Sequence, residues 1–464
     1  RLIFATDESV CMSESGDVWN FYRTTVTTLL DSDPIDVATT SSKISILREM
    51  ISYEDRLVLL SDQTQFIAYG DPVLSPSTIS IAPITNFESS KTAAPVSQGG
   101  SVFFPFRRGT SSGVREWFSN DASSQTFNTN DITAHIPQYI EGNITKLAAS
   151  PQENVILCLT DANPDTIYCF NYFETGQGRE QFAWSKFTFP GSIIHSVEFV
   201  AEKAYIFHST KTGGAAATMV SYVTNISSIN FQPNRTDGDL GVQVKLDRRF
   251  SQADALSTPT YDEDTDLTVI SMPYGFTGED ALELGTDPSD DMVPRNAFKI
   301  VSAINGAHAV PVKWTLGRLA YVPGNWTPTS PVVSQRTWFM GEDYEMSYTF
   351  SKPLFKPVSA GKTTAIQGRH QLRYGSLMFS NSGPFNVEVT QADGTTYEHL
   401  FSGKILGSPD TVLGTMTLKT GDFSFPIFSE SDSVTIKVVS NYPIGPRLES
   451  AEFEANFSTR SRRL

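Results

Sequence analysis

The chain has 464 residues, which fits two to four domains, and 39% of them are hydrophobic and 11% aromatic. This composition provides for a large buried core and argues against global disorder. No run of about 18 apolar residues occurs, so no membrane-spanning helix is expected. The formal net charge of −16 argues against tight, sequence-specific DNA binding, which requires a basic surface.

Five β-hairpins are the first predicted elements in chain order, and they begin near Arg1, Arg56, Ser101, Asn154 and Lys203. Their starts lie 55, 45, 53 and 49 residues apart, and β-propeller blades repeat about every 40 to 50 residues. We therefore predict that residues 1–231 form β-propeller blades, completed by upstream residues or by later strands. The chain begins with Arg1 rather than Met, and we expect it to be a fragment whose upstream part is missing.

One segment, residues 17–37, departs from the hairpin pattern. It is expected to contain a helical turn that ends at Asp33, because the residue before a proline disfavours the helical region.

Residues 232–340 are predicted to be a β-rich insertion with long acidic loops. Between Phe250 and Pro294 there are eleven acidic residues and no Lys or Arg. Such a block is usually a solvated loop or surface, and it can also repel polyanions or attract a basic partner.

Residues 341–464 are predicted to form a separate antiparallel β-sandwich or barrel-like unit. About eight short strands are expected there, and polar and apolar residues alternate cleanly in the stretches 433–440 and 451–458. The whole chain is therefore predicted to be all-β.

The three cysteines are Cys11, Cys158 and Cys169. An odd, sparse count argues against a disulfide scaffold and favours a reducing site of synthesis. Cys158 and Cys169 are predicted to lie on the two arms of one hairpin. We interpret them as small buried hydrophobic side chains, although the hairpin could also bring them near each other.

Two motifs resemble a catalytic and a metal-binding pattern, but neither fits its pattern fully. The stretch from Gly109 to Gly113 matches the G-x-S-x-G pattern of a serine nucleophile, but its flanks predict two strands and a hairpin rather than a strand and a helix. The acidic run from Asp262 to Asp266 begins like a calcium loop, yet Leu267 stands where that loop needs glycine. We predict no catalytic, cofactor-binding or metal-binding residues.

Several long stretches resemble the nozzle proteins, or tail tubular proteins B, of short-tailed autographivirus-type bacteriophages. Examples are MSESGDVWNFYRTTVTTLLDSDPIDV and FFPFRRGTSSGVREWF. The similar stretches cover most of the chain and are residues 12–37, 59–71, 103–118, 131–151, 401–409, 420–443 and 448–464. The resemblance is weakest over residues 250–335, and it implies that this chain is the C-terminal part of such a protein.

The resemblance implies a non-enzymatic virion protein with a β-propeller in its fold. It further implies a ring of six copies below a tail adaptor, or gatekeeper, ring, where tail fibres dock and double-stranded DNA passes without sequence-specific binding. The protein would belong to the virion tail, be assembled in the host bacterial cytoplasm, and could contact the host cell envelope.

A DNA conduit should not bind its cargo, because each cation in the lumen would gain affinity through counterion release. Part of the acidic block is therefore a candidate lining of the DNA passage or its opening. The alternative is a loop on the outer surface that only keeps the particle soluble. The candidate residues are Asp262, Glu263, Asp264, Asp266, Glu279, Asp280, Asp287, Asp290 and Asp291.

Two other functions remain open from the sequence. A propeller that binds a host receptor would need exposed aromatic residues at loop tips, and Trp117, Trp184 or Trp326 could serve unless they pack in a core or an interface. A cell-surface glycan hydrolase would need an acid/base cluster, and no such cluster stands out in the sequence.

Overall fold

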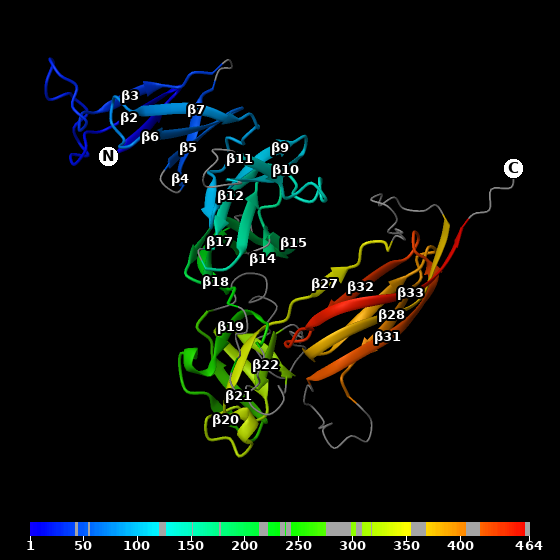
Figure 1. Cartoon of the computed structure of the whole chain (residues 1–464). Coiled ribbons are helices and arrows are strands. Elements are labelled where there is room, and N and C mark those ends of the chain that lie inside the picture. Colours follow the sequence, from blue (N-terminus) through cyan, green and yellow to red (C-terminus); the bar gives the residue numbers. More distant parts are fainter. Residues whose placement is uncertain are drawn as a thin grey trace. The chain divides into compact units, whose positions relative to one another are not determined.

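The computed structural model describes residues 1–41, 45–53, 56–119, 127–150, 152–175, 178–212, 221–232, 237, 243–274, 298–302, 309–316, 318–353, 368–404 and 418–459. These residues form β-strands, turns and two short 3-10 helices, η2 (Gln252–Asp254) and η3 (Val333–Gln335), and no α-helix occurs among them. The all-β prediction is confirmed (Figure 1). Within the described residues, no helix has the length and apolarity needed to cross a membrane.

The chain divides into two compact units, residues 1–212 with 220–232 and residues 213–219 with 233–464. Each unit is described by itself. The division into regions 1–231, 232–340 and 341–464 stays a prediction.

The first unit contains five antiparallel sheets that follow one another along the chain. Sheet I has β1 (Ile3–Thr6), β2 (Ser9–Met12) and β3 (Ile35–Ala38), and sheet II has β4 (Leu47–Tyr53), β5 (Arg56–Ser61), β6 (Gln65–Gly70) and β7 (Ile79–Thr85). Sheet III has β8 (Val96–Gln98), β9 (Ser101–Arg108), β10 (Ser111–Ser119) and β11 (Phe127–Asp131). Sheet IV has β12 (Ile144–Ala149), β13 (Val155–Thr160), β14 (Thr166–Thr175) and β15 (Gly178–Thr188), and sheet V has β16 (Ser192–Val200), β17 (Lys203–Thr212) and β18 (Ser221–Asn230).

All five predicted hairpins are present, as the pairs β1–β2, β5–β6, β9–β10, β13–β14 and β17–β18. In sheets II, III and IV the hairpin forms the middle of a four-stranded meander, because a further strand pairs with each of its edges. Four-stranded antiparallel sheets are the form that propeller blades take. The propeller itself stays a prediction.

Consecutive sheets of the first unit pack face to face through four apolar cores. In sheet II, Leu59 packs in a core with sheet I, whereas its neighbours Val58 and Leu60 pack in a core with sheet III. In sheet IV every residue of β13 is buried, because alternate side chains enter cores with sheets III and V. These two-sided cores explain why the central hairpins have continuous apolar runs in the sequence.

Sheet IV also separates the two cysteines of its hairpin. Cys158 lies in the core shared with sheet III, and Cys169 lies in the core shared with sheet V. Both side chains are fully buried as free thiols on opposite faces of one sheet. Their interpretation as small buried hydrophobic residues is confirmed.

The segment between β2 and β3 does not contain the expected helical turn. In residues 13–34 the backbone forms isolated turns and bends, such as the one closed by the Asn20 N–H and the Asp17 carbonyl oxygen, 3.4 Å apart. The guanidinium of Arg1 holds the base of this loop by donating to the carbonyl oxygens of Ser13, Asp31 and Asp33. These long-range contacts favour the looped path over local helix formation.

The second unit begins with two four-stranded sheets around one core. One sheet contains β19 (Asp247–Ser251), β26 (Trp338–Glu342), β22 (Phe298–Ser302) and β23 (Ala309–Pro311). The other contains β20 (Thr260–Asp262), β21 (Leu267–Ser271), β25 (Leu319–Pro323) and β24 (Trp314–Leu316). Trp326 and Trp338 are fully buried between these sheets, and the Trp338 indole N–H donates to the Trp326 carbonyl oxygen at 3.1 Å.

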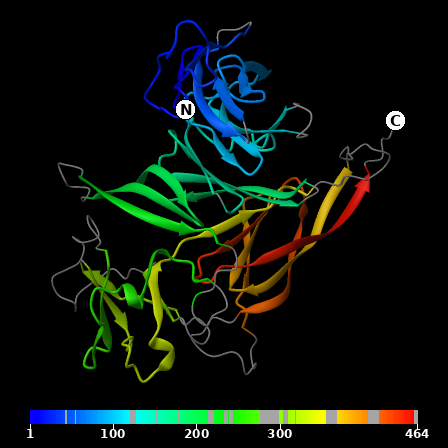
Figure 2. The same cartoon turned by 60° about the vertical axis from the view of Figure 1, so that its left-hand side comes forward.

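The C-terminal strands form a sandwich, as predicted for this region. Its sheets are β27 (Met346–Thr349), β32 (Thr435–Ser440), β29 (Phe385–Thr390) and β30 (Thr396–Phe401), and β31 (Lys419–Glu430), β28 (Gly368–Ser382) and β33 (Leu448–Thr459). The long strands β28 and β33 run side by side (Figures 1 and 2). The buried side chains of β29 alternate with partly exposed ones, so the strand has one face in the core.

Candidate functional site

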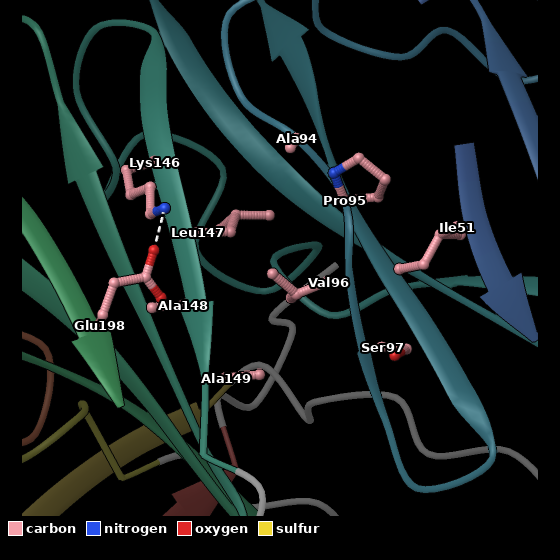
Figure 3. Close-up of a pocket in the computed structure, with 10 residues that line it drawn as sticks. All are labelled: Ile51, Ala94, Pro95, Val96, Ser97, Lys146, Leu147, Ala148, Ala149 and Glu198. Carbon is pink, nitrogen blue, oxygen red and sulfur yellow. Dashed lines mark hydrogen bonds and ion pairs between the residues drawn. The ribbon is translucent and has the colours of Figure 1, made fainter. Parts of the chain in front are cut away.

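A pocket of about 320 Å³ lies in the first unit, where the first strands of sheets II to V come together (Figure 3). β12 packs beside both β8 and β16, and β8 packs beside β4. The lining comes from these strands and the approach to β8, and it consists of Ile51, Ala94, Pro95, Val96, Ser97, Lys146, Leu147, Ala148, Ala149 and Glu198.

Lys146 and Glu198 are the charged residues of this lining, and they form an ion pair with each other. The remaining side chains are small and mostly aliphatic. The lining offers no histidine or cysteine, and its one hydroxyl group, that of Ser97, has no base among the lining residues apart from the ion-paired Glu198. This arrangement fits packing of a small apolar group better than acid–base chemistry.

Four residues of the acidic block, Asp262, Glu263, Asp264 and Asp266, lie at the exposed turn between β20 and β21. Asp262 Oδ1 accepts the Asp264 N–H at 3.1 Å, and Asp262 Oδ2 accepts the Thr265 hydroxyl at 2.8 Å. Asp266 has a positive φ of 51°, which Asp tolerates better than most residues. Part of this acidic pattern therefore serves turn geometry.

Asp262, Glu263, Asp264 and Asp266 are all exposed in this turn. The Tyr261 hydroxyl donates to Asp266 Oδ1 at 2.8 Å, and this bond raises the pKa of Tyr261. Five other predicted site residues lie outside the described residues, namely Glu279, Asp280, Asp287, Asp290 and Asp291. The role of the block in DNA passage stays a proposal.

Among the described residues there is no group of three or more His, Cys, Asp or Glu side chains that could hold a metal ion.

The motif from Gly109 to Gly113 is a hairpin, with Gly109 at φ 62° in the turn between β9 and β10. Ser111 and Ser112 are buried, and the Ser112 hydroxyl donates to the Gly142 carbonyl oxygen at 2.7 Å. The strand–turn–strand interpretation is confirmed.

The tryptophans proposed as receptor contacts do not sit at exposed tips. Trp117 and Trp326 are fully buried, and the partly buried Trp184 donates its indole N–H to the Ile132 carbonyl oxygen at 3.1 Å. Their alternative interpretation, packing in the core, is the one that the structure supports.

An exposed apolar loop lies elsewhere, between β2 and β3. Trp19 and Tyr22 are 83% and 84% exposed, and Val26 is also fully exposed. We call residues 13–34 the β2–β3 loop. The available sequence signal was its departure from the hairpin pattern, because its apolar residues follow no strand alternation.

The comparison with protein families decides the class of the chain. The family described as bacteriophage nozzle protein matches residues 1–464. The chain belongs to the bacteriophage nozzle protein family. As a nozzle protein it is a structural component of the phage tail, and the resemblance found in the sequence is confirmed.

A curated relative of this nozzle-family chain is the tail tubular protein gp12 of Escherichia phage T7. The two are 24% identical over 466 residues, a match that covers 99% of this chain. The chain spans about half the length of this relative, namely 55% of it.

Two solved structures have a low similarity to the chain. Hsv2 of Kluyveromyces lactis has a TM-score of 0.27 and 7% identity, over 62% of this chain and 75% of that one. An exo-β-1,3-galactanase of Phanerochaete chrysosporium has a TM-score of 0.19 and 13% identity, over 83% of this chain and 98% of that one. Likenesses of this size carry no argument about the fold or the activity of the nozzle protein.

Proposed function

We propose that the chain forms part of the wall of a distal tail tube through which double-stranded DNA leaves the particle. The observation that carries this proposal is the match of the nozzle family to the whole chain. Sheets joined face to face by apolar cores suit a rigid wall, because packed cores resist deformation. The net charge of −16 suits a conduit that must not retain DNA.

The proposed tube is a closed ring of identical copies, six in number, made by head-to-tail contacts. Its proposed protein partners are the tail adaptor, or gatekeeper, ring and the tail fibre, and DNA would pass through it as unbound cargo. It would be assembled in the host bacterial cytoplasm. The role is proposed to be non-enzymatic. Two observations support this: Ser111 lies in the β9–β10 hairpin rather than at a strand-to-helix turn, and the charged residues of the pocket, Lys146 and Glu198, are paired with each other.

Within this function, we propose that the exposed turn with Asp262, Glu263, Asp264 and Asp266 faces the DNA path or its opening. In physiological salt its field extends only about 8 Å, so the turn must line a narrow passage to act on DNA. The competing position is the outer wall, where the same charges would only aid solubility.

The proposal is tested in particles whose copies carry D262N, E263Q, D264N and D266N together. Slower DNA ejection at low salt is expected, measured by the release of a DNA-binding dye signal. The matched control removes four exposed carboxylates of the C-terminal sandwich, through E398Q, E449Q, E452Q and E454Q. Equal ejection rates in both variants would reject the passage role of the turn, and imaging of intact tails without six-fold symmetry would reject the ring.

Host-surface recognition is a second candidate function, favoured by one observation. The exposed Trp19 and Tyr22 of the β2–β3 loop are residue types that dominate the binding energy of interfaces. W19A with Y22A should then slow adsorption to cells while leaving DNA ejection from adsorbed particles unchanged. Normal adsorption by this variant would remove the candidate.

A further inference from the structure

Arg115 of β10 lies among aromatic rings on one face of sheet III. Its guanidinium carbon is 4.3 Å from the ring centroid of Phe106 and 4.6 Å from that of Phe87. Aromatic rings attract the flat faces of a guanidinium group. Such contacts leave the N–H groups at the edge of the guanidinium free to donate hydrogen bonds. The two phenylalanines therefore fix the orientation of Arg115 without using its hydrogen bonds.

The hydrogen-bonding capacity of Arg115 is unused within the described chain. No oxygen of the described residues accepts a hydrogen bond from its guanidinium, and its buried Nε has no partner. Buried donors in proteins are nearly always paired, so an unpaired one calls for an explanation.

A second cation lies beside Arg115. Arg108 contacts the same Phe106 ring, with its guanidinium carbon 5.1 Å from the centroid, and pairs with Asp131 through Nη2. Its buried Nη1 is unpaired. Asp131 Oδ1 is already occupied by the backbone N–H and the hydroxyl of Thr133, at 2.9 and 2.7 Å.

Asp131 pairs with Arg108 and lies across the strand pair from Arg115. One carboxylate thus stands beside two guanidinium groups, and the cluster carries one uncompensated positive charge. Burial lowers the pKa of Arg115, Asp131 opposes this effect, and Arg108 adds to it by repulsion. A second anion at the cluster would relieve the repulsion and pair the Nη groups of Arg115, which have no acceptor among the described residues and are not among its buried unpaired atoms.

We propose that the edge of the Arg115 guanidinium, with Arg108 beside it, binds a carboxylate side chain of a partner protein. A carboxylate accepts two parallel hydrogen bonds from one guanidinium edge, and it supplies the single negative charge that the cluster lacks. Nucleic acid fits less well, because a row of phosphates would meet Asp131 and a chain of net charge −16. This proposal uses none of the residues of the acidic turn and does not depend on the proposed conduit.

The test measures binding of a fluorescein-labelled hexaglutamate peptide to the 464-residue chain by fluorescence anisotropy at low salt. R115Q should weaken binding by about tenfold or more, the effect expected for losing hydrogen bonds between charged groups. The matched control is R107Q, which also removes one positive charge. Arg107 is exposed on the opposite face of β9, and its Nε donates to the Gly109 carbonyl oxygen at 3.1 Å.

The proposal is supported if R115Q weakens peptide binding by about tenfold or more while R107Q weakens it by less than about twofold. Equal losses in R107Q and R115Q would overturn the proposal, because they would report bulk charge alone. Tighter, Arg115-dependent binding of a labelled 12-base-pair duplex would overturn it in favour of phosphate. If R115Q unfolds, R115K replaces it, since lysine keeps the charge but lacks the planar edge; wild-type affinity in R115K would then reject the site.

Discussion

Arg179 of β15 and Glu116 of β10 join sheets III and IV through two parallel hydrogen bonds, of 2.7 Å from Nη1 to Oε2 and 2.8 Å from Nη2 to Oε1. The Glu116 side chain is only 7% exposed, and its Oε1 also accepts the Ser101 hydroxyl at 2.9 Å. The Arg179 guanidinium carbon lies 4.3 Å from the ring centroid of Tyr172. The pair is therefore held by both charge and packing.

Removing one member of this pair should destabilise the first unit. E116Q leaves the partly buried Arg179 without a full counter-charge, and breaking a largely buried pair in this way costs about 3 kcal/mol. Urea unfolding followed by tryptophan fluorescence measures the loss. The control is E198Q, which breaks the exposed pair with Lys146 and should cost less than about 1 kcal/mol. Equal effects of the two variants would contradict the distinction between them.

The second unit should be less stable at neutral pH than in mild acid because of Asp247. Burial, and then the carboxylate of Glu342 directly across the strand pair, raise the pKa of Asp247 to about 6, while Arg248 opposes this. A raised pKa means that the folded state prefers protonated Asp247. The stability that protonated Asp247 contributes is fully present below its pKa in the unfolded chain, about 4, and is lost as pH rises through its folded-state pKa of about 6.

D247N should therefore raise the unfolding temperature at pH 8 and flatten its dependence on pH between 4 and 7. Asp254 provides a control of opposite sign, because hydrogen bonds from Ser251 lower its pKa. Its contribution is present at neutral pH and is lost as pH falls through the folded pKa, so D254N should lower the unfolding temperature at pH 8. Calorimetry from pH 4 to 8 measures both, and an unchanged pH profile in D247N would refute the assignment.

Native thiol reactivity should be confined to Cys11. Burial raises the pKa of Cys169 to about 12 and raises that of Cys158 as well, so neither thiol ionises at neutral pH or meets the reagent. Cys11 is partly exposed on sheet I. Ellman's reagent should titrate one thiol in the folded chain and all three after denaturation. Rapid reaction of either remaining thiol in folded C11S would contradict the burial.

Gly113 should not tolerate a side chain. A Cβ there would lie 2.5 Å from the Phe106 ring and 2.6 Å from Thr133 Oγ1, so the ring must move from its place beside Arg115. G113A is expected to cost about 1–3 kcal/mol through overpacking. G100A is the control, because a Cβ at that position meets nothing within 4 Å. Thermal unfolding compares them, and equal midpoints would refute the steric argument.

The sequence predicts most reliably what depends on local pattern. The five hairpins follow from apolar runs of strand length, such as Val155–Thr160, separated by turn residues. The helical turn expected within residues 17–37 is absent, because the form of the β2–β3 loop depends on Arg1, which donates to carbonyl oxygens about 30 residues away. Glu116 and Arg179 are 63 residues apart in the sequence, so no local sequence pattern predicts that they pair.

The same limit applies to the candidate sites. The acidic turn is visible in the sequence because its residues are adjacent, whereas the Arg115 cluster gathers side chains from Phe87 to Asp131. Its components only become a site when β9, β10 and β11 pair and place Arg108 and Arg115 on one face.

The four cores between sheets I and V each draw on sheets that are neighbours along the chain. Such a nearest-neighbour arrangement lets structure propagate from one unit to the next. During translation, each core can close as soon as its second sheet has left the ribosome, without waiting for the C-terminal sandwich. The order in which the sheets are synthesised is then also the order in which their apolar faces are withdrawn from water. Aggregation-prone surface is thereby limited to the most recently made sheet.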